Sequence, residues 1–171
     1  STKTHGTSGI WSNILVRRNL PWYERLAKRL GVKVQDTEYG FTWASRRVVK
    51  GINGEARAGS VHFYDSDIWA VVGKEIQDRL PKGFTIYSEI LGFTPEGSPI
   101  QGEYHYGCQP GTHRMQVYRI TQTNLDGVVT EMGWPQMQGF CKKHGFEMVE
   151  TLFYGFAEDL VPYATHMTDV D

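Results

Sequence analysis

Residues 68–91, IWAVVGKEIQDRLPKGFTIYSEIL, join two patterns that together indicate the fold class. Over 68–80 the apolar side chains recur at helical spacing and share one face, namely Ile68, Val71, Val72, Ile76 and Leu80. Pro81 ends this predicted helix, and Gly83 turns the chain. The segment 84–91 is apolar enough for a buried strand. A helix followed directly by a strand predicts a domain that mixes the two.

The same alternation extends toward the N-terminus. A turn at 6–9 precedes a predicted strand over 10–16, and Pro21 fits the start of a helix that Gly31 stops. A strand over 39–49 and a loop over 50–60 follow.

Toward the C-terminus the pattern predicts a loop over 105–114, a strand over 115–120, a helix over 134–144 and a strand over 147–153. Strands and helices are thus interleaved, as in a mixed α/β or α+β domain. No repeat, low-complexity tract or linker interrupts the chain. We therefore expect one domain over 1–171.

Composition bounds the class of protein. The chain has 171 residues, of which 40% are hydrophobic and 22% charged, an ordinary balance for a globular protein. No apolar run has the roughly 20 residues of a membrane helix, and residues 1–9 lack the apolar stretch of a signal peptide, so we expect neither feature in this sequence. Cys108 and Cys141 do not form a disulfide framework, so a reducing, cytoplasmic setting is expected.

The charge pattern leaves nucleic-acid binding open. The net charge is −1, yet basic residues pair locally at 17–18, 28–29 and 46–47. Local patches matter more for nucleic acids than the total charge. The chain also has 22 aromatic residues, five Trp, nine Tyr and eight Phe. Most should belong to the core, with a minority free to stack on a base.

Three short segments carry residues suited to phosphate chemistry. Lys3 lies near Gly6, and glycine lets a backbone approach a phosphate closely. A lysine nucleophile must lose its proton, which requires desolvation or cationic neighbours. Without such surroundings, a terminal lysine is most often a solvated surface residue.

The second and third segments supply a carboxylate and a pair of guanidinium groups. Glu89 interrupts an apolar strand, so it should face a cleft, a cation or a hydroxyl-bearing ligand, unless it lies at an edge in water. Arg46 and Arg47 follow a predicted strand, and the arginine fork suits phosphate.

Two groups of possible metal ligands are weaker. His105, Cys108 and His113 lie together in sequence, but they lack the paired spacing of common zinc sites and a fourth ligand. Asp65 and Asp67 suggest a magnesium pair, although a solvated loop is the better interpretation. We therefore assign no metal site.

Taken together, the motifs resemble a known superfamily. Lys-x-His-Gly-Thr at 3–7, Ser-Arg at 45–46 and Tyr-x-Glu-Ile-x-Gly at 87–92 are similar to motifs of the covalent nucleotidyltransferases. The His-Gly-Thr form resembles the ATP-dependent RNA ligases of bacteriophage and RNA-editing type, since DNA ligases and capping enzymes more often have aspartate where His5 stands. The resemblance covers residues 1 to about 155. It implies an α+β nucleotidyltransferase (ATP-grasp-like ligase) domain, with antiparallel sheets flanked by helices.

The resemblance also implies roles for particular residues. Lys3 would attack ATP and become lysyl-AMP, with Mg²⁺ on the phosphates, and Arg46 or Arg47 would contact phosphate or the RNA 3′ end. The implied partners are an RNA 5′-phosphate and a 3′-hydroxyl, in the cytoplasm of a host cell if a phage encodes the chain. The nucleotide-binding residues that the resemblance implies, besides Lys3, are Thr4, His5, Gly6, Arg46, Glu89 and Tyr118.

The chain departs from the family pattern at two places. Thr2 stands where glutamate usually precedes the lysine, and the later Glu-Gly-(Val/Ile)-Val and Lys-x-Lys strands are only imitated, by 126–129 and by Lys142 with Lys143. Those segments are expected instead to be a turn and a solvated helix end. The resemblance therefore implies that 1–171 is incomplete at its C-terminus. The alternatives are a DNA ligase or capping-type enzyme, or an inactive nucleic-acid-binding relative.

Overall fold

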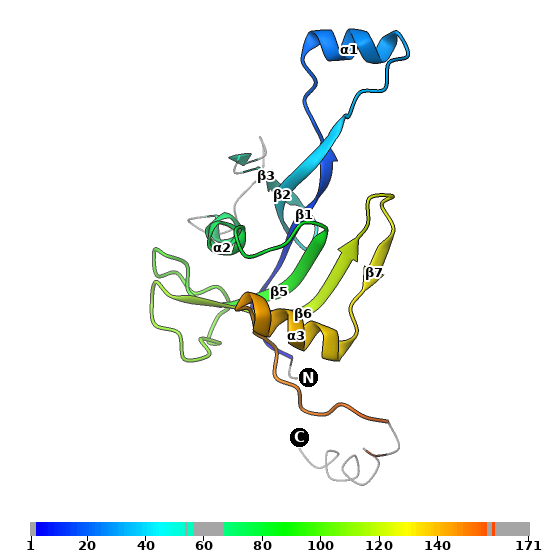
Figure 1. Cartoon of the computed structure of the whole chain (residues 1–171). Helices are drawn as coiled ribbons and strands as arrows, with labels where there is room; N and C mark the ends of the chain where they lie inside the picture. The colour runs from blue at the N-terminus through cyan, green and yellow to red at the C-terminus, as the bar shows by residue number, and fades with distance from the viewer. Residues whose placement is uncertain (1–2, 54, 57–66, 157–158, 160–171) are drawn as a thin grey trace.

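A computed structural model describes residues 3–53, 55–56, 67–156 and 159, and its centre is one twisted sheet (Figure 1). The sheet has eight strands in the order β4-β3-β2-β1-β5-β6-β7, with β8 paired to β6. All neighbours are antiparallel except β6 and β8. The strands are β1 (Thr7–Arg17), β2 (Thr37–Ser45), β3 (Val49–Ile52), β4 (Glu55–Ala56), β5 (Phe84–Gly92), β6 (His113–Thr123), β7 (Val129–Glu131) and β8 (Glu147–Met148).

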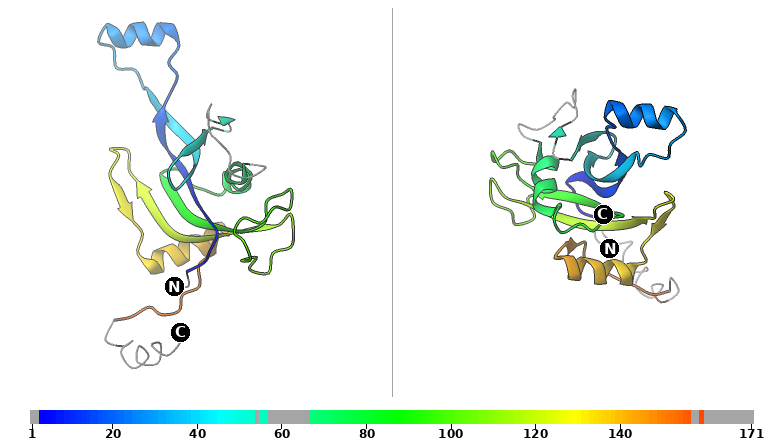
Figure 2. Two further views of the ribbon diagram at one scale, coloured as in Figure 1. Left: turned by 180° about the vertical axis from the view of Figure 1, so that it is seen from behind. Right: turned by 45° about the horizontal axis from the view of Figure 1, so that its top comes forward.

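Two of the three described helices cover the same face of this sheet. They are α2 (Ile68–Ile76) and α3 (Trp134–His144), whose buried side chains join one apolar cluster with β1, β5 and β6. The ring of Phe140 on α3 lies 4.9 Å from the ring of Phe84 on β5. Figure 2 shows both helices on one side of the sheet. The third helix, α1 (Trp22–Arg29), lies beyond the ends of β1 and β2. Neither of these two helices covers the opposite face of β1, β5 and β6.

Trp11 on β1 is the centre of the core. Its side chain is 0% exposed, and its indole N–H donates to the Trp69 carbonyl oxygen on α2 at 3.1 Å. The ring crosses its own strand over Gly9, where a Cβ would collide with it. A glycine is therefore required beside this tryptophan, and β1 and α2 are locked together next to the N-terminal segment.

The α+β prediction is confirmed, with a correction to its layers: the described strands form one sheet, and α2 and α3 share a face. The helix predicted over 134–144 has those bounds, and Gly145 ends it at φ 68°. Pro21 is the N-cap of α1, as its position predicted. The strands predicted over 10–16, 84–91 and 115–120 lie within β1, β5 and β6.

Several predicted bounds were wrong. The strand over 39–49 is broken by a bend at 46–47, because Ser45 N–H donates to the Val48 carbonyl and closes a turn. The loop over 50–60 instead contains β3 and β4 in its described part. Gly51 belongs to β3 because the Trp43 ring packs where a Cβ would be.

Other differences lie at element ends. The helix predicted to 80 ends at Ile76 and continues as a turn to Leu80, whose N–H still donates to the Ile76 carbonyl. Of the strand predicted over 147–153, only 147–148 form a strand, β8. The strand β6 begins at His113, inside the predicted loop 105–114. The strand β7 was not predicted. Among the described residues, no helix is both long and apolar enough to cross a membrane.

Candidate functional site

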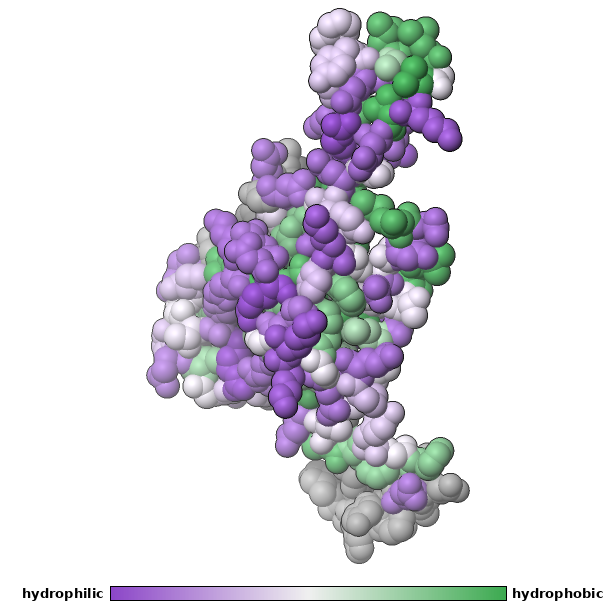
Figure 3. All heavy atoms as spheres, viewed as in Figure 1, coloured by the Kyte–Doolittle hydropathy of each residue, from purple (hydrophilic) through white to green (hydrophobic). Residues whose placement is uncertain are grey.

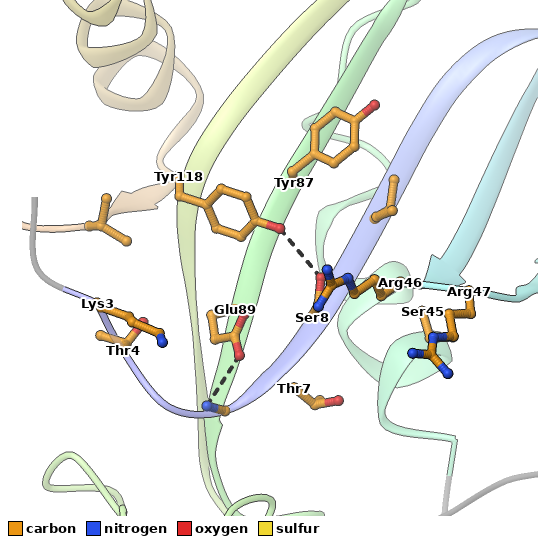
Figure 4. A pocket seen from close by; sticks show the side chains of 13 residues that line it. Lys3, Thr4, Thr7, Ser8, Ser45, Arg46, Arg47, Tyr87, Glu89 and Tyr118 are labelled. Atoms are coloured by element: carbon orange, nitrogen blue, oxygen red, sulfur yellow. Dashed lines mark hydrogen bonds between the residues drawn. The ribbon is translucent and has the colours of Figure 1, made fainter.

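A pocket of about 960 Å³ opens on the face of the sheet that α2 and α3 leave uncovered. Its size is in the range of small-molecule and cofactor sites. Figure 4 shows side chains from the N-terminal segment, from β1 and β5, from β6 and from the bend after β2 pointing toward it. The lining residues are Lys3, Thr4, Gly6, Thr7, Ser8, Ile10, Ser45, Arg46, Arg47, Tyr87, Glu89, Tyr118 and Val149.

The segment 3–6 forms one wall by crossing the end of β5. Gly6 lies so close to β5 that a Cβ there would collide with the Ile90 carbonyl oxygen. Its N–H donates to Glu89 Oε1 at 3.2 Å. The close approach expected of Gly6 is thus made to a neighbouring strand, and this approach brings the exposed Lys3 side chain toward Glu89 (Figure 4).

Glu89 is held at the centre of the pocket by strand register. It lies opposite Ser8 on β1, and its side chain is partly buried. Burial raises the pKa of Glu89 above its ordinary value, while the Gly6 N–H bond and the charge of His5 partly lower it. Of the two alternatives that the sequence left open, an open cleft or an edge position in water, Glu89 faces the cleft.

Two tyrosines supply the aromatic surface of the pocket. The Tyr118 side chain is 39% exposed, and its hydroxyl lies 3.3 Å from Ser8 Oγ. Tyr87 lies opposite Ile10 in the register of β1 and β5, so these two side chains share the open face. A ring that is fixed at its hydroxyl and exposed on its face can stack on a planar ligand.

Arg46 and Arg47 reach the pocket from the bend between β2 and β3, and both are exposed. They approach from the side opposite Lys3 and Thr4, with Glu89 between (Figure 4). Guanidinium groups in this position can bind phosphate or carboxylate.

His5 points away from the pocket toward the segment between β5 and β6. Its ring stacks on Tyr104 with 4.8 Å between centroids, and the backbone N–H of His5 donates to the Tyr106 hydroxyl at 2.6 Å. Of the eight residues singled out from the sequence, the structure gathers seven around the pocket, whereas the His5 ring anchors the segment that carries Lys3.

Sequence reasoning gave no site role to six of the lining residues, although three of them stand in the quoted motifs: Thr7, Ser8, Ile10, Ser45, Tyr87 and Val149. The period-2 alternation of β1 could have found Ser8 and Ile10, since strand residues two apart share a face. Nothing local marks Val149, which reaches the pocket because its N–H pairs with Val117 after β8.

Three of the five weaker metal candidates contact other groups, and Cys108 is a free cysteine. His113 Nε2 lies 3.2 Å from a Glu75 carboxylate oxygen, and His105 stacks on Phe93 at 4.6 Å. Asp67 caps α2 by accepting from the Ala70 N–H, whereas Asp65 lies outside the described residues, as does Thr2.

The two segments that imitate later family motifs lie elsewhere in the fold. Asp126 and Gly127 form the turn before β7, with Gly127 at φ 82°, and Lys142 and Lys143 are exposed at the end of α3. Both features match the plainer interpretation of a turn and a solvated helix end. Within the described chain, neither segment lines the pocket.

Replacing Glu89 by glutamine should stabilise the fold at neutral pH. A carboxyl whose folded-state pKa is raised makes the folded chain less stable as pH rises from the unfolded to the folded pKa. Glu89→Gln removes this loss of stability, and the glutamine side-chain oxygen can still accept the hydrogen bond from the Gly6 N–H. The gain should be below about 1 kcal/mol, because the side chain is only half-buried. This gain in stability should vanish below that pH window, as measured by urea unfolding at several pH values.

The matched control is Glu38→Gln, at an exposed position on β2. An equal gain in stability in this control would contradict the prediction.

Comparison with protein-family models and with curated proteins found no match to this chain. The function of the pocket is therefore inferred from the chemistry of its side chains and from the sequence motifs to which they belong.

Proposed function

We propose that this chain is the adenylation domain of an ATP-dependent RNA ligase and acts in the cytoplasm through a lysyl-AMP intermediate. The observation that carries the proposal is the convergence of separate motifs on one pocket. Lys3, Arg46 and Glu89 come from three distant segments, yet all line the same open cavity, together with Tyr118. A chance resemblance between short motifs would give no reason for them to meet.

In the first step, the unprotonated Lys3 Nζ attacks the α-phosphorus of ATP. An N–P bond forms, the bond from that phosphorus to the oxygen bridging to the β-phosphate breaks, and pyrophosphate leaves with the electron pair. The lysine proton passes to solvent. Arg46 and Arg47 supply cationic neighbours across the pocket, and a bound nucleotide would cover the exposed amine.

The remaining residues orient the nucleotide. The Glu89 carboxylate accepts from a ribose hydroxyl, Tyr118 stacks on adenine, and Gly6 keeps the lysine segment against β5. Such positioning supplies much of the rate in phosphoryl transfer, where the protein has little covalent chemistry of its own to perform.

Two further steps join the RNA. An oxygen of the RNA 5′-phosphate attacks the lysyl-AMP phosphorus, so that a P–O bond forms, the N–P bond breaks and Lys3 regains a proton. The 3′-hydroxyl of the other strand then attacks the activated 5′-phosphate, and AMP leaves.

The donor set of the pocket fits magnesium carried on ATP. Glu89 is the one carboxylate among the described lining residues, and no group of three or more His, Cys, Asp or Glu in the described chain is placed to hold a metal. Magnesium often keeps several waters and binds through substrate phosphates. There it would neutralise charge as pyrophosphate departs.

Incubation with ATP and magnesium, followed by intact-mass analysis, tests the proposal. We expect a gain of one AMP, mapped by peptide sequencing to Lys3. Labelling by GTP instead would indicate a capping-type enzyme, and sealing of DNA but not RNA nicks would indicate a DNA ligase. Salt-sensitive RNA binding without any adenylate would indicate an inactive nucleic-acid-binding relative.

A further inference from the structure

The segment 17–36, which we name the α1 arm, projects from the sheet beyond the ends of β1 and β2 (Figure 1). Its own polar contacts hold it together. Arg18 N–H donates to the Asp36 carbonyl at 2.9 Å, and the Arg18 side chain pairs with Glu24. Lys28 pairs with Asp36. The arm is therefore an ordered extension of the β1–β2 hairpin.

The arm exposes large side chains that a core would normally bury. No residue of α1 is buried against the described chain. Trp22 is 72% exposed and Leu30 76% exposed. The rings of Trp22 and Tyr23 meet edge to face with 6.1 Å between centroids, and Tyr23 is exposed as well. A surface of this kind marks an interaction site.

The arm also concentrates positive charge. It has six basic residues, Arg17, Arg18, Arg25, Lys28, Arg29 and Lys33, against the acidic Glu24 and Asp36, a net charge of +4 in a chain whose total is −1. Apolar and charged side chains lie side by side at this end of the molecule (Figure 3). Arg25 and Arg29 are exposed and one helical turn apart. The charge complement of this surface is a polyanion.

We infer that the α1 arm is a second contact site for the RNA strand whose end enters the pocket. Its arginines contact phosphates, and its exposed aromatic rings stack on bases, the combination used to bind single-stranded nucleic acid. This charge favours RNA over a protein partner or a second copy of the chain. The inference rests on the proposed function for the identity of the ligand.

The distance from pocket to arm sets a length requirement. Thr7 lies at the pocket and Arg17 at the base of the arm, the two ends of β1. Ten steps along a strand span about 33 Å. A strand stacked at about 3.4 Å per nucleotide covers this span with about 10 nucleotides, and an unstacked single strand, which extends further per nucleotide, covers it with fewer. RNA shorter than this span should occupy the pocket without reaching the arm.

The test measures binding of the full chain to 5′-phosphorylated single-stranded RNA by fluorescence anisotropy, using one RNA twice as long as the stacked span and a dinucleotide, which is too short to bridge the span even when extended. Trp22→Ala should weaken binding of the long RNA about tenfold. Arg25→Gln with Arg29→Gln should lower the slope of log affinity against log salt by about 1.4 for the long RNA. Neither variant should change binding of the short RNA.

The matched control is Lys142→Gln with Lys143→Gln, which removes the same charge from an exposed helix end. An equal loss in this control, or an equal loss for both RNA lengths, would overturn the inference. A third result would also overturn it. If the unaltered chain is a dimer, and Leu26→Glu on the exposed surface of α1 dissociates this dimer without changing RNA binding, the arm is a dimer contact and not an RNA contact. Lysyl-AMP formation without RNA is measured on every variant. If no variant forms lysyl-AMP, but only the arm variants bind the long RNA more weakly, the proposed function fails and the arm inference stands.

Discussion

A Lys3→Met chain incubated with ATP and magnesium should keep its unmodified mass, while the unaltered chain gains one AMP. Loss of the nucleophile removes the bond-forming atom itself, so the rate of adenylate formation should fall at least about a thousandfold. Methionine keeps an unbranched side chain at an exposed position, and the fold should therefore be unaffected. Intact-mass analysis over a time course measures the effect.

Lys142→Met is the control, because Lys142 is also exposed and lies at the end of α3 away from the pocket. It should label at the rate of the unaltered chain. A Lys3→Met protein that still carried AMP, on whichever lysine, would contradict the assignment. In that case Lys50 is the first residue to check for bound AMP, because its side chain is buried and its amine lies 4.2 Å from the centre of the Trp69 ring.

The features that the sequence predicted correctly are those set by local patterns. The helix over 134–144 has a proline inside its start and a glycine after its end, and both signals act within a few residues. The same holds for Pro21 at the start of α1 and for the turn at 126–127. Gly6 was singled out for a close approach to a phosphate, whereas the close approach that the structure shows is to Ile90 on β5.

The features that were missed depend on pairing between distant strands. Val149 lines the pocket because its N–H donates to the Val117 carbonyl oxygen on β6, a pairing that neither segment reveals alone. Gly51 belongs to a strand because Trp43 packs over it, so a glycine that suggests a loop is here a packing requirement. Long-range contacts of this kind override local propensity.

The position of α2 and α3 is a further example. An amphipathic helix shows that one side is buried, but its sequence does not say which face of a sheet it covers. Both helices pack on the Trp11 face of the sheet, so neither covers the face that carries the pocket. The site therefore depends on a core that no single motif contains.

Trp11→Ala should destabilise the chain by about 3–5 kcal/mol, because it removes a fully buried ring from the centre of that cluster. The Trp69 carbonyl would also lose the indole N–H that ties α2 to β1. The midpoint of guanidinium unfolding, analysed with an unchanged slope, measures the loss.

Trp22→Ala deletes the same atoms from the exposed arm and should change the free energy of unfolding by less than about 0.5 kcal/mol. Equal losses at the two positions would mean that Trp11 is not the centre of the core. A large loss at Trp11 alone would tie the stability of the sheet to β1, the strand that also carries Ser8 and Ile10 into the pocket. Core packing and the geometry of the candidate site would then depend on opposite faces of a single strand.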